Sequence, residues 1–257
     1  MTVMASSPGF APMAAALRDQ VIEHYERLGT RLDTVAGRRT LDTNSTLAAD
    51  RGRLLLRLLA EAGGPPIAGR RVLDLGAGFG ALSVYFAHLG ADVVAVDPQE
   101  TRLQVGVAVA RRYGLPLSAI SAHAHALPLP DAAFHVAVAN NALCYVVDRK
   151  LRHAALAELL RVLMPGGWLV MRNPNRITPL DPFTGVPLLA LLPPALSRRA
   201  ARGLRCHRSD VRLTSPYGAV LELRRAGFAQ ASWRAAPGRR VGSRVAPYHH
   251  VVARHPS

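Results

Sequence analysis

The stretch VLDLGAGFG, residues 72–80, constrains the fold of this chain more than any other feature of its sequence. An apolar run that contains one aspartate leads directly into glycines at positions 76, 78 and 80. Glycines at alternate positions allow the backbone to turn tightly and allow another group to approach it closely. The sequence therefore predicts a strand followed by a ligand-binding turn, and the identity of that ligand decides the function.

Downstream of residue 70, predicted strands and helices alternate. Short apolar runs such as VVAV and WLVM are typical of strands covered on both faces, which indicates a parallel sheet flanked by helices. The fold class is therefore α/β. The predicted strands cover residues 72–75, 92–96, 120–122, 134–139, 168–172, 229–233 and 244–253, and the predicted helices cover residues 81–89, 100–113, 150–163 and 215–225.

The regions outside this alternation give the domain organisation. Helical spacing of apolar residues predicts helices over residues 17–28 and 47–59, with capping side chains at residues 42–46 ahead of the second. Between residues 173 and 214 a segment rich in proline and leucine interrupts the alternation, which is typical of a lid or substrate wall. We predict an N-terminal helical cap over residues 1–66 and a core over residues 67–257, with a lid at residues 173–214.

The positive charge of the chain by itself would favour a nucleic acid or an anionic membrane as partner, but the composition weakens that interpretation. The formal net charge is +15, but Lys150 is the only lysine, and GC-rich codon usage produces such an arginine bias without any ligand. The arginines are scattered, and aromatic residues make up only 5%, which leaves few platforms for stacking bases. The composition argues against a nucleic-acid partner and leaves a membrane or anionic-substrate patch open at residues 198–212.

Other global features point to a cytoplasmic protein. The longest apolar stretch, residues 186–196, is interrupted by three prolines and falls short of the roughly 20 residues of a membrane span. The N-terminus has no early basic cluster of a signal peptide. Cys144 and Cys206 form no CxxC pair, which argues against a disulfide scaffold and a zinc ribbon.

Two classes of ligand fit the glycine turn. Gly76, Gly78 and Ala81 match G-x-G-x-x-G/A, and Asp97 follows the next strand about 20 residues later, as in dinucleotide-binding domains. Asp74 distinguishes a dinucleotide from a ligand of the second class, which is positively charged, because an acid just before the first glycine would repel the pyrophosphate of a dinucleotide. For a ligand with a cationic ammonium and sulfonium, the same acid can fix loop amides or lie opposite positive charge.

Four stretches in register resemble the motifs of class I S-adenosylmethionine-dependent methyltransferases. VLDLGAGFG is similar to the first motif, and VVAVDP, residues 93–98, is similar to the second, whose acid holds the ribose hydroxyls. The resemblance continues through AHALPLPDAAFHVAVANNALCYV, residues 124–146, and LLRVLMPGGWLVM, residues 159–171, and RRAGF at residues 224–228 fits the usual entry to the sixth strand. It implies a doubly wound, mostly parallel, seven-stranded Rossmann-like sheet with S-adenosylmethionine as cofactor.

The resemblance also implies the cofactor site. Where family members often have an acid that contacts the adenine amino group, this chain has His123, and His135 replaces an acid at the start of the fourth strand. A neutral histidine can still accept a hydrogen bond. His123 and His125 are expected as neighbours on one face of a strand. Because no third metal ligand is expected near them, the pair does not predict a metal site. The expected cofactor-binding residues are Asp74, Gly76, Ala77, Gly78, Gly80, Asp97, Pro98, His123, Ala124, His125 and Asn140.

The catalytic residues and the acceptor are less well defined. An alcohol acceptor needs a base, and the candidates are His24 and His207. His24 lies in a helix that family members fold over the site. Tyr145 occupies a position that in related enzymes often faces the substrate. The sequence NNAL at residues 140–143 lacks the box used by enzymes that methylate base amino groups.

The composition of the predicted lid indicates the class of methyl acceptor. Its leucines and arginines suit a small molecule with an apolar body or lipid anchor and a polar or anionic end, with peripheral contact to the inner membrane face through residues 185–212. We expect O-methylation of a natural product or a glycolipid-like hydroxyl. A C-methyltransferase acting on a quinone precursor, an RNA methyltransferase and a non-catalytic binding module remain alternatives.

Overall fold

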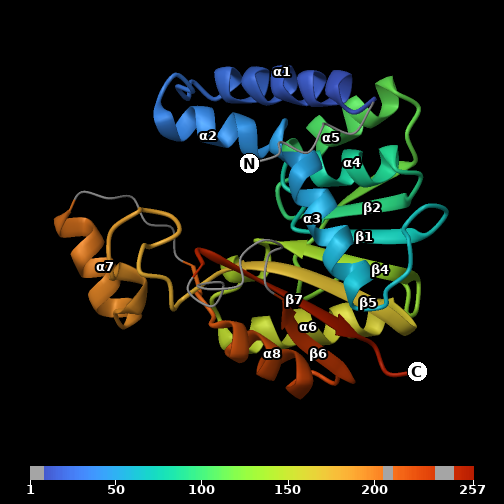
Figure 1. Ribbon diagram of the computed structural model, residues 1–257. Coiled ribbons are helices and arrows are strands. Elements are labelled where there is room, and N and C mark those ends of the chain that lie inside the picture. Colours follow the sequence, from blue (N-terminus) through green and yellow to red (C-terminus); the bar gives the residue numbers. More distant parts are fainter. Residues whose placement is uncertain (1–8, 205–210, 235–245) are drawn as a thin grey trace.

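The computed structural model of the chain describes residues 9–204, 211–234 and 246–257 (Figure 1). One sheet runs through it, with the strand order β3-β2-β1-β4-β5-β7-β6. The first five strands pair in parallel, and β7 runs antiparallel to both of its neighbours. The strands are β1 (Arg71–Leu75), β2 (Asp92–Asp97), β3 (Leu117–Ser121), β4 (Phe134–Asn140), β5 (Leu163–Pro174), β6 (Gln230–Arg234) and β7 (Tyr248–Arg254). The predicted α/β class and the mostly parallel, seven-stranded sheet are confirmed.

Helices cover both faces of this sheet, because its central strands carry apolar side chains on both sides (Figure 1). One apolar cluster joins the sheet to α1 (Ala11–Arg27), α3 (Leu47–Glu61), α4 (Ala81–His88) and α5 (Glu100–Arg112). A second cluster joins the opposite face to α6 (Arg149–Val162) and α8 (Pro216–Arg225). Along β5, Val170 belongs to the first cluster and Met171 to the second, as the strand period of two requires.

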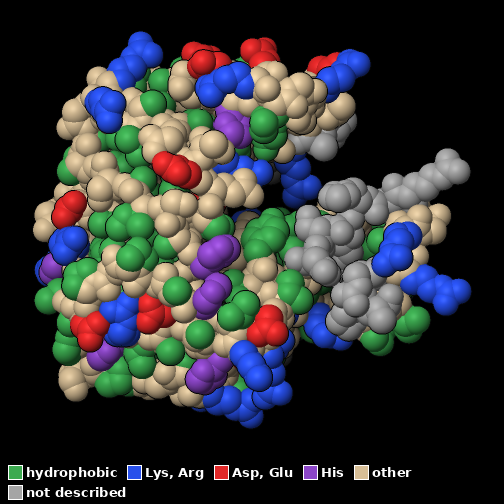
Figure 2. All heavy atoms as spheres, turned by 180° about the vertical axis from the view of Figure 1, so that it is seen from behind, with side chains coloured by type: hydrophobic (Ala, Val, Ile, Leu, Met, Phe, Trp, Pro, Cys, Tyr) green, Lys and Arg blue, Asp and Glu red, His purple; other side chains and the backbone are tan. Residues whose placement is uncertain are grey.

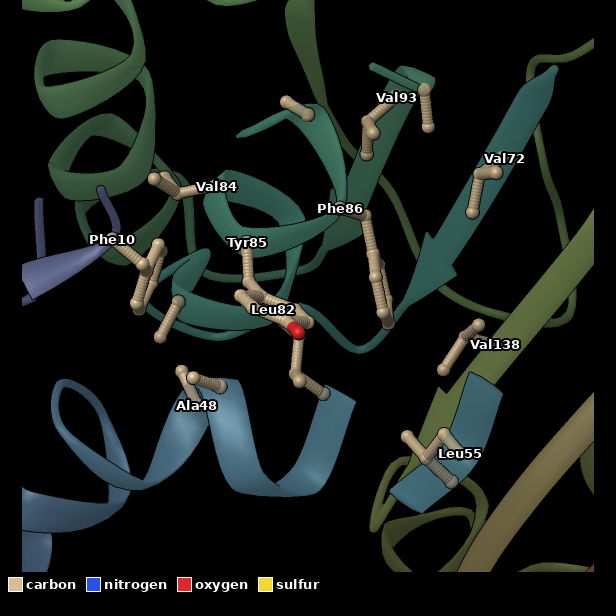
Figure 3. Packing of buried hydrophobic residues seen from close by; sticks show 14 of the residues in the cluster. Phe10, Ala48, Leu55, Val72, Leu82, Val84, Tyr85, Phe86, Val93 and Val138 are labelled. Atoms are coloured by element: carbon tan, nitrogen blue, oxygen red, sulfur yellow. The ribbon is translucent and has the colours of Figure 1, made fainter. Parts of the chain in front are cut away.

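The N-terminal helices pack directly on the core (Figure 3). The Phe10 ring lies edge-on against Tyr85 of α4, with centroids 5.1 Å apart. Gly52 of α3 lets that helix approach α4, since a Cβ at this position would lie 2.2 Å from Tyr85 Cδ1. The division into a cap of residues 1–66 and a core stays a prediction, but the two share one hydrophobic cluster.

Within the described residues, several elements differ from the sequence-based expectation. Helix α1 begins six residues earlier than predicted and β3 three residues earlier, and the helix within the lid segment was not predicted. Helix α2 (Val35–Thr43) was not expected, because its apolar residues are too few for a helical pattern; the Thr34 hydroxyl caps it by accepting from the Gly37 amide at 3.0 Å. The expected side-chain cap of α3 is wrong, because Thr46 makes no capping bond. Strand β5 begins at Leu163, ahead of the expected turn, where the register to β4 shifts.

The lid segment leaves the sheet at the end of β5 and contains a short 3-10 helix, η2 (Leu189–Leu191), and α7 (Pro194–Gly203). Its two ends meet at a bridge between Asn175 and Thr214, and Figure 1 shows α7 well away from the sheet. Within the described ranges, no helix combines the length and the apolar character needed to cross a bilayer.

Candidate functional site

The candidate site lies where the strand order of the sheet reverses. From β1 the chain proceeds to β2 and β3 on one side, and β4 and β5 lie on the other. The loops that follow β1 and β4 therefore separate at the carboxyl edge of the sheet, and open α/β sheets bind their ligands in the crevice this creates. The glycine turn at residues 76–80 follows β1, and Asn140 and Asn141 stand at the end of β4.

The three glycines of the turn have three different surroundings. A Cβ at Gly76 would lie 2.3 Å from the Ala142 Cβ, in the loop after β4, and a Cβ at Gly80 would lie 3.0 Å from the Gly106 Cα of α5. A Cβ at Gly78 would meet no protein atom within 4 Å. All three have positive φ. Gly76 and Gly80 therefore serve packing, whereas Gly78 leaves bare backbone facing open space, as a bound cofactor requires.

Asp97 at the end of β2 holds the turn in shape. Its Oδ2 accepts a hydrogen bond from the Gly78 amide at 3.0 Å, and its Oδ1 accepts one from the Gln99 amide at 2.9 Å, across Pro98. The amides of Gly76 and Ala77 both donate to the Val96 carbonyl, at 2.7 and 3.0 Å. Each carboxylate oxygen can accept further hydrogen bonds, so the half-buried Asp97 keeps capacity for ligand hydroxyls beside the turn.

Asp74 lies beneath the turn and is 1% exposed. Its Oδ2 accepts a hydrogen bond from the Ser83 hydroxyl at 2.6 Å, in the first turn of α4. Burial raises the pKa of Asp74 to about 6, which the bond from Ser83 opposes. The acid is anchored to the helix rather than to the loop amides that the sequence suggested, and its carboxyl group lies under the glycine turn.

The segment after β3 carries His123, Ala124 and His125. The expectation that both histidines lie on one face of a strand is wrong, because β3 ends at Ser121. Their rings nevertheless stack, with centroids 5.3 Å apart, and the Ala122 amide donates to the Asp97 carbonyl at 3.3 Å. The segment is thereby tied to the end of β2. Within residues 9–204, 211–234 and 246–257, no three His, Cys, Asp or Glu side chains gather as metal ligands would.

Helix α1 brings His24 onto the glycine turn. The buried His24 ring lies edge-on against Phe79, the residue between Gly78 and Gly80, with centroids 5.1 Å apart. Burial, followed by the charges of Arg102 and Arg27, lowers the pKa of His24, so the imidazole is neutral near pH 7. A neutral imidazole can accept a proton.

The other two catalytic candidates lie elsewhere. Tyr145 ends the short helix η1 (Leu143–Tyr145) after β4 and is 57% exposed. His207 lies outside the described residues. The structure thus gathers His24, the glycine turn and Asp97 around one place, while Tyr145 lies on the neighbouring loop after β4.

Sequence reasoning missed Arg172, which lies beside the predicted site residue Asn140. Arg172 of β5 pairs with Asn140 in the sheet register. Its guanidinium lies 3.6 Å from the centroid of the Tyr248 ring. Its backbone carbonyl accepts a hydrogen bond from the Asn141 amide at 2.7 Å. Asn141 has a φ of 57°, and its Oδ1 is buried without a hydrogen-bond partner. An arginine at the end of the apolar run WLVMR was the only signal in the sequence.

Comparison with known proteins agrees with this geometry. A family model described as a methyltransferase domain matches residues 72–167. A demethylmenaquinone methyltransferase of Renibacterium salmoninarum is 38% identical over 144 residues, which cover 56% of this chain and 57% of that protein. A ubiquinone/menaquinone biosynthesis C-methyltransferase of Shewanella frigidimarina is 39% identical over 108 residues, covering 40% and 42%. The chain spans about half the length of these curated relatives.

A solved structure extends the likeness over nearly the whole chain. A 1,6-didemethyltoxoflavin-N1-methyltransferase of Burkholderia thailandensis, solved with S-adenosylhomocysteine, aligns with a TM-score of 0.56 at 20% identity. The alignment covers 99% of this chain and 94% of that one. At this level of identity the likeness concerns the fold, and it includes the helices ahead of β1 and the segment after β5.

Proposed function

Because residues 72–167 form a class I S-adenosylmethionine-dependent methyltransferase domain, we propose that this chain transfers the methyl group of S-adenosylmethionine to a small-molecule acceptor. The observation that carries the proposal is the open backbone at Gly78, braced by Asp97 at the point where the strand order reverses. A side chain at Gly78 would fill the space that the cofactor needs.

In this reaction each residue of the site has its own role. S-adenosylmethionine, when bound, supplies a methyl group activated by its sulfonium. The backbone of residues 76–80 cradles it, Asp97 accepts hydrogen bonds from its ribose hydroxyls, and Asp74 contributes negative charge beneath. The segment at residues 123–125 lines the adenine side. Asn140, the register partner of Arg172 at the end of β4, contacts the cofactor.

The protein's task in such a transfer is chiefly to place a nucleophile in line with the methyl group and to exclude water. Helix α1 covers the glycine turn through His24 and Tyr25, whose rings contact Phe79 at centroid distances of 5.1 and 5.6 Å. We propose His24 as the base for an acceptor hydroxyl, since its lowered pKa leaves it neutral and ready to accept a proton.

The methylated atom separates two candidates. We propose O-methylation of a natural product or a glycolipid-like hydroxyl, in keeping with the apolar lid and a histidine base. C-methylation of a quinone precursor is the second candidate, and the names of the two relatives favour it. Product analysis by two-dimensional NMR distinguishes the two candidates. After O-methylation the new methyl protons correlate with an acceptor carbon across an oxygen atom, whereas after C-methylation they correlate with the acceptor carbon to which the methyl group is bonded.

The lid supports a lipid-linked or partly apolar acceptor. Leu188, Leu191 and Leu196 are all exposed, with Leu188 at 58%, and this surface continues into the arginines of α7. Exposed leucines beside basic residues suit the boundary of an anionic membrane. We propose peripheral membrane contact through residues 185–212, of which residues 205–210 lie outside the described ranges.

The test uses the full chain with methyl-labelled S-adenosylmethionine and a fractionated cell extract, followed by mass analysis of the labelled product. We expect label in a small organic molecule and none with the Asp97→Ala variant. Label in RNA would overturn the proposal in favour of an RNA methyltransferase. Binding of S-adenosylhomocysteine without labelled product in any fraction would show a non-catalytic binding module.

A further inference from the structure

Two arginines that have no carboxylate partner among the described residues lie on the α3 face of the sheet, next to the proposed transfer site. Arg172 lies on the same strand face as Val170, which packs toward α3, and α3 contributes Arg51. The charges of Arg51 and Arg39 each act on Arg172, and Tyr248 acts on both Arg51 and Arg172. Arg39 of α2, Arg51 of α3 and Arg172 of β5 therefore bring positive charge to one place, beside Tyr248 of β7.

Two arginines elsewhere in the described residues show how acids compensate such a charge. Arg152, 3% exposed, binds Glu222 at 2.8 Å, and the half-buried Arg161 binds both Glu158 and Asp131. Within the described residues, neither Arg51 nor Arg172 has an acidic partner. Burial is the main cause that lowers the pKa of Arg172, to about 10, and the pKa of Arg51 also falls. Charges withdrawn from water are ordinarily compensated, and among the described residues these two half-buried arginines have no anion to compensate them.

The two guanidinium groups are held in place by neutral contacts. Arg51 donates to the Thr43 carbonyl at 2.9 Å and to the Thr43 hydroxyl at 3.0 Å. Arg172 stacks on the Tyr248 ring, forms a side-chain hydrogen bond with Tyr248 and donates to Asn140 Oδ1 at 3.5 Å. Each guanidinium has five N–H donors, so several remain for an additional acceptor. Neutral positioning of a charged fork is typical of a site for a planar or tetrahedral oxyanion.

A second observation points to a ligand at the same place. Asn141, which follows the register partner of Arg172, has a buried Oδ1 without a hydrogen-bond partner, and so does Nε2 of His250, the partner of Arg172 on β7. Figure 2 shows basic side chains at a hollow between the N-terminal helices and the lid side of the molecule. Ala142, one residue beyond Asn141, contacts the glycine turn, so this place adjoins the cofactor site.

We propose that Arg51 and Arg172 bind an anionic oxygen group, a carboxylate or phosphate, of the methyl acceptor, an inference that rests on the proposed function. The pair fixes the charged end of the acceptor over β5 and thereby points the remainder toward β4 and the glycine turn. Arg39, exposed on α2, adds positive charge at the same place. The acceptor is therefore an organic acid or a phosphorylated molecule rather than a neutral one.

The experiment is calorimetric titration of benzoate, phenyl phosphate and neutral benzamide into the full chain saturated with S-adenosylhomocysteine. We expect at least one of the two anions to bind and benzamide not to bind. Arg172→Gln and Arg51→Gln should each weaken anion binding about tenfold or more, the loss expected for a charge-assisted pair. Arg57→Gln is the matched control, because Arg57 lies on the same helix but pairs with Glu61 in solvent, and it should change nothing.

The outcomes separate this inference from the proposed function. Failure of S-adenosylhomocysteine to bind the wild-type chain would refute the proposed function. Its binding without any preference for the anions over benzamide, or with equal anion affinity in both arginine variants, would overturn the anion site alone. Preference for benzoate or for phenyl phosphate identifies the anion as carboxylate or phosphate. If Arg172→Gln does not fold, Arg51→Gln, on a helix surface, gives the same comparison.

Discussion

At the scale of single residues, alternate glycines with the same sign of φ have separate tasks. Gly80 allows α4 and α5 to approach, whereas Gly78 keeps backbone bare toward open space. From the sequence alone, both glycines are assigned to a ligand-binding turn. Their spacing predicts the turn, but it does not show which atoms a side chain at each position would contact. Their variants should therefore differ in which property is lost.

Gly78→Ala and Gly80→Ala make this difference measurable. Both place alanine at positive φ, which costs about 1–2 kcal/mol. Gly80→Ala adds a contact at 3.0 Å to Gly106 backbone and should lower the melting temperature further than Gly78→Ala does. Gly78→Ala should instead lose affinity for S-adenosylhomocysteine in calorimetry. Equal melting temperatures with equal affinities would refute the division.

Asp74 makes the ligand-free chain sensitive to pH. Its folded-state pKa of about 6 exceeds its ordinary 3.8, so the folded chain holds this proton more tightly than the unfolded chain, and stability is lost as pH rises from about 4 to 6. Asp74→Asn removes that loss while an amide oxygen can still accept from Ser83. Relative to wild type, the variant should gain up to about 3 kcal/mol in unfolding free energy between pH 4 and pH 7.5. Urea titrations at both values measure it, and an unchanged difference would contradict the assignment.

At the scale of elements, two segments outside the parallel strands give the site its character. Helix α1 covers the glycine turn, and the lid segment presents leucines to solvent. Neither position follows from the periodicity of its own sequence. Each depends on contacts with residues far away in the chain, such as Phe79 for α1 and the bridge to Thr214 for the lid.

His24→Phe separates packing from catalysis in α1. Phenylalanine keeps a ring against Phe79 but cannot accept a proton. We expect S-adenosylhomocysteine affinity within about threefold of wild type and labelled methyl transfer reduced about a hundredfold or more, as for loss of a general base. His207→Ala is measured beside it. A near-normal rate for His24→Phe would leave His24 as a packing residue, and near-normal rates for both would remove the histidine base altogether.

The lid surface has its own test. Leu188→Ser, Leu191→Ser and Leu196→Ser combined should abolish most cosedimentation with vesicles rich in phosphatidylglycerol, because the exposed apolar surface is lost while the arginines remain. Leu221→Ser, on the exposed side of α8, is the control and should bind as wild type does. Equal binding by the triple variant, or no binding by wild type, would exclude the membrane contact.

At the scale of the whole molecule, the reversal of strand order and the two hydrophobic clusters fix the site between the loops after β1 and β4. Ligand binding to this site stabilises the entire fold. S-adenosylhomocysteine at about a hundred times its dissociation constant should add about 2.7 kcal/mol, seen as a rise in melting temperature, and NAD should add nothing. Stabilisation by NAD instead would return the glycine turn to the dinucleotide class.

The sequence by itself determined the sheet, the glycine turn and Asp97. Strand periodicity and the positions of glycines are local properties, and a stretch such as VLDLGAGFG carries them within nine residues. Local reasoning erred where signals were weak or exceptional: α2 has few apolar residues, and the histidines after β3 lie beyond the strand end.

Only the tertiary structure decided which distant residues share the site. Arg51 and Arg172 are 121 positions apart and belong to a helix and a strand that meet across the sheet face, so no spacing in the sequence joins them. That neither has an acidic partner among the described residues is likewise a property of the packed molecule, because pairing depends on what surrounds a side chain. The physical reason is the same in both cases: periodicity is set by neighbours along the chain, whereas charge compensation is set by neighbours in space.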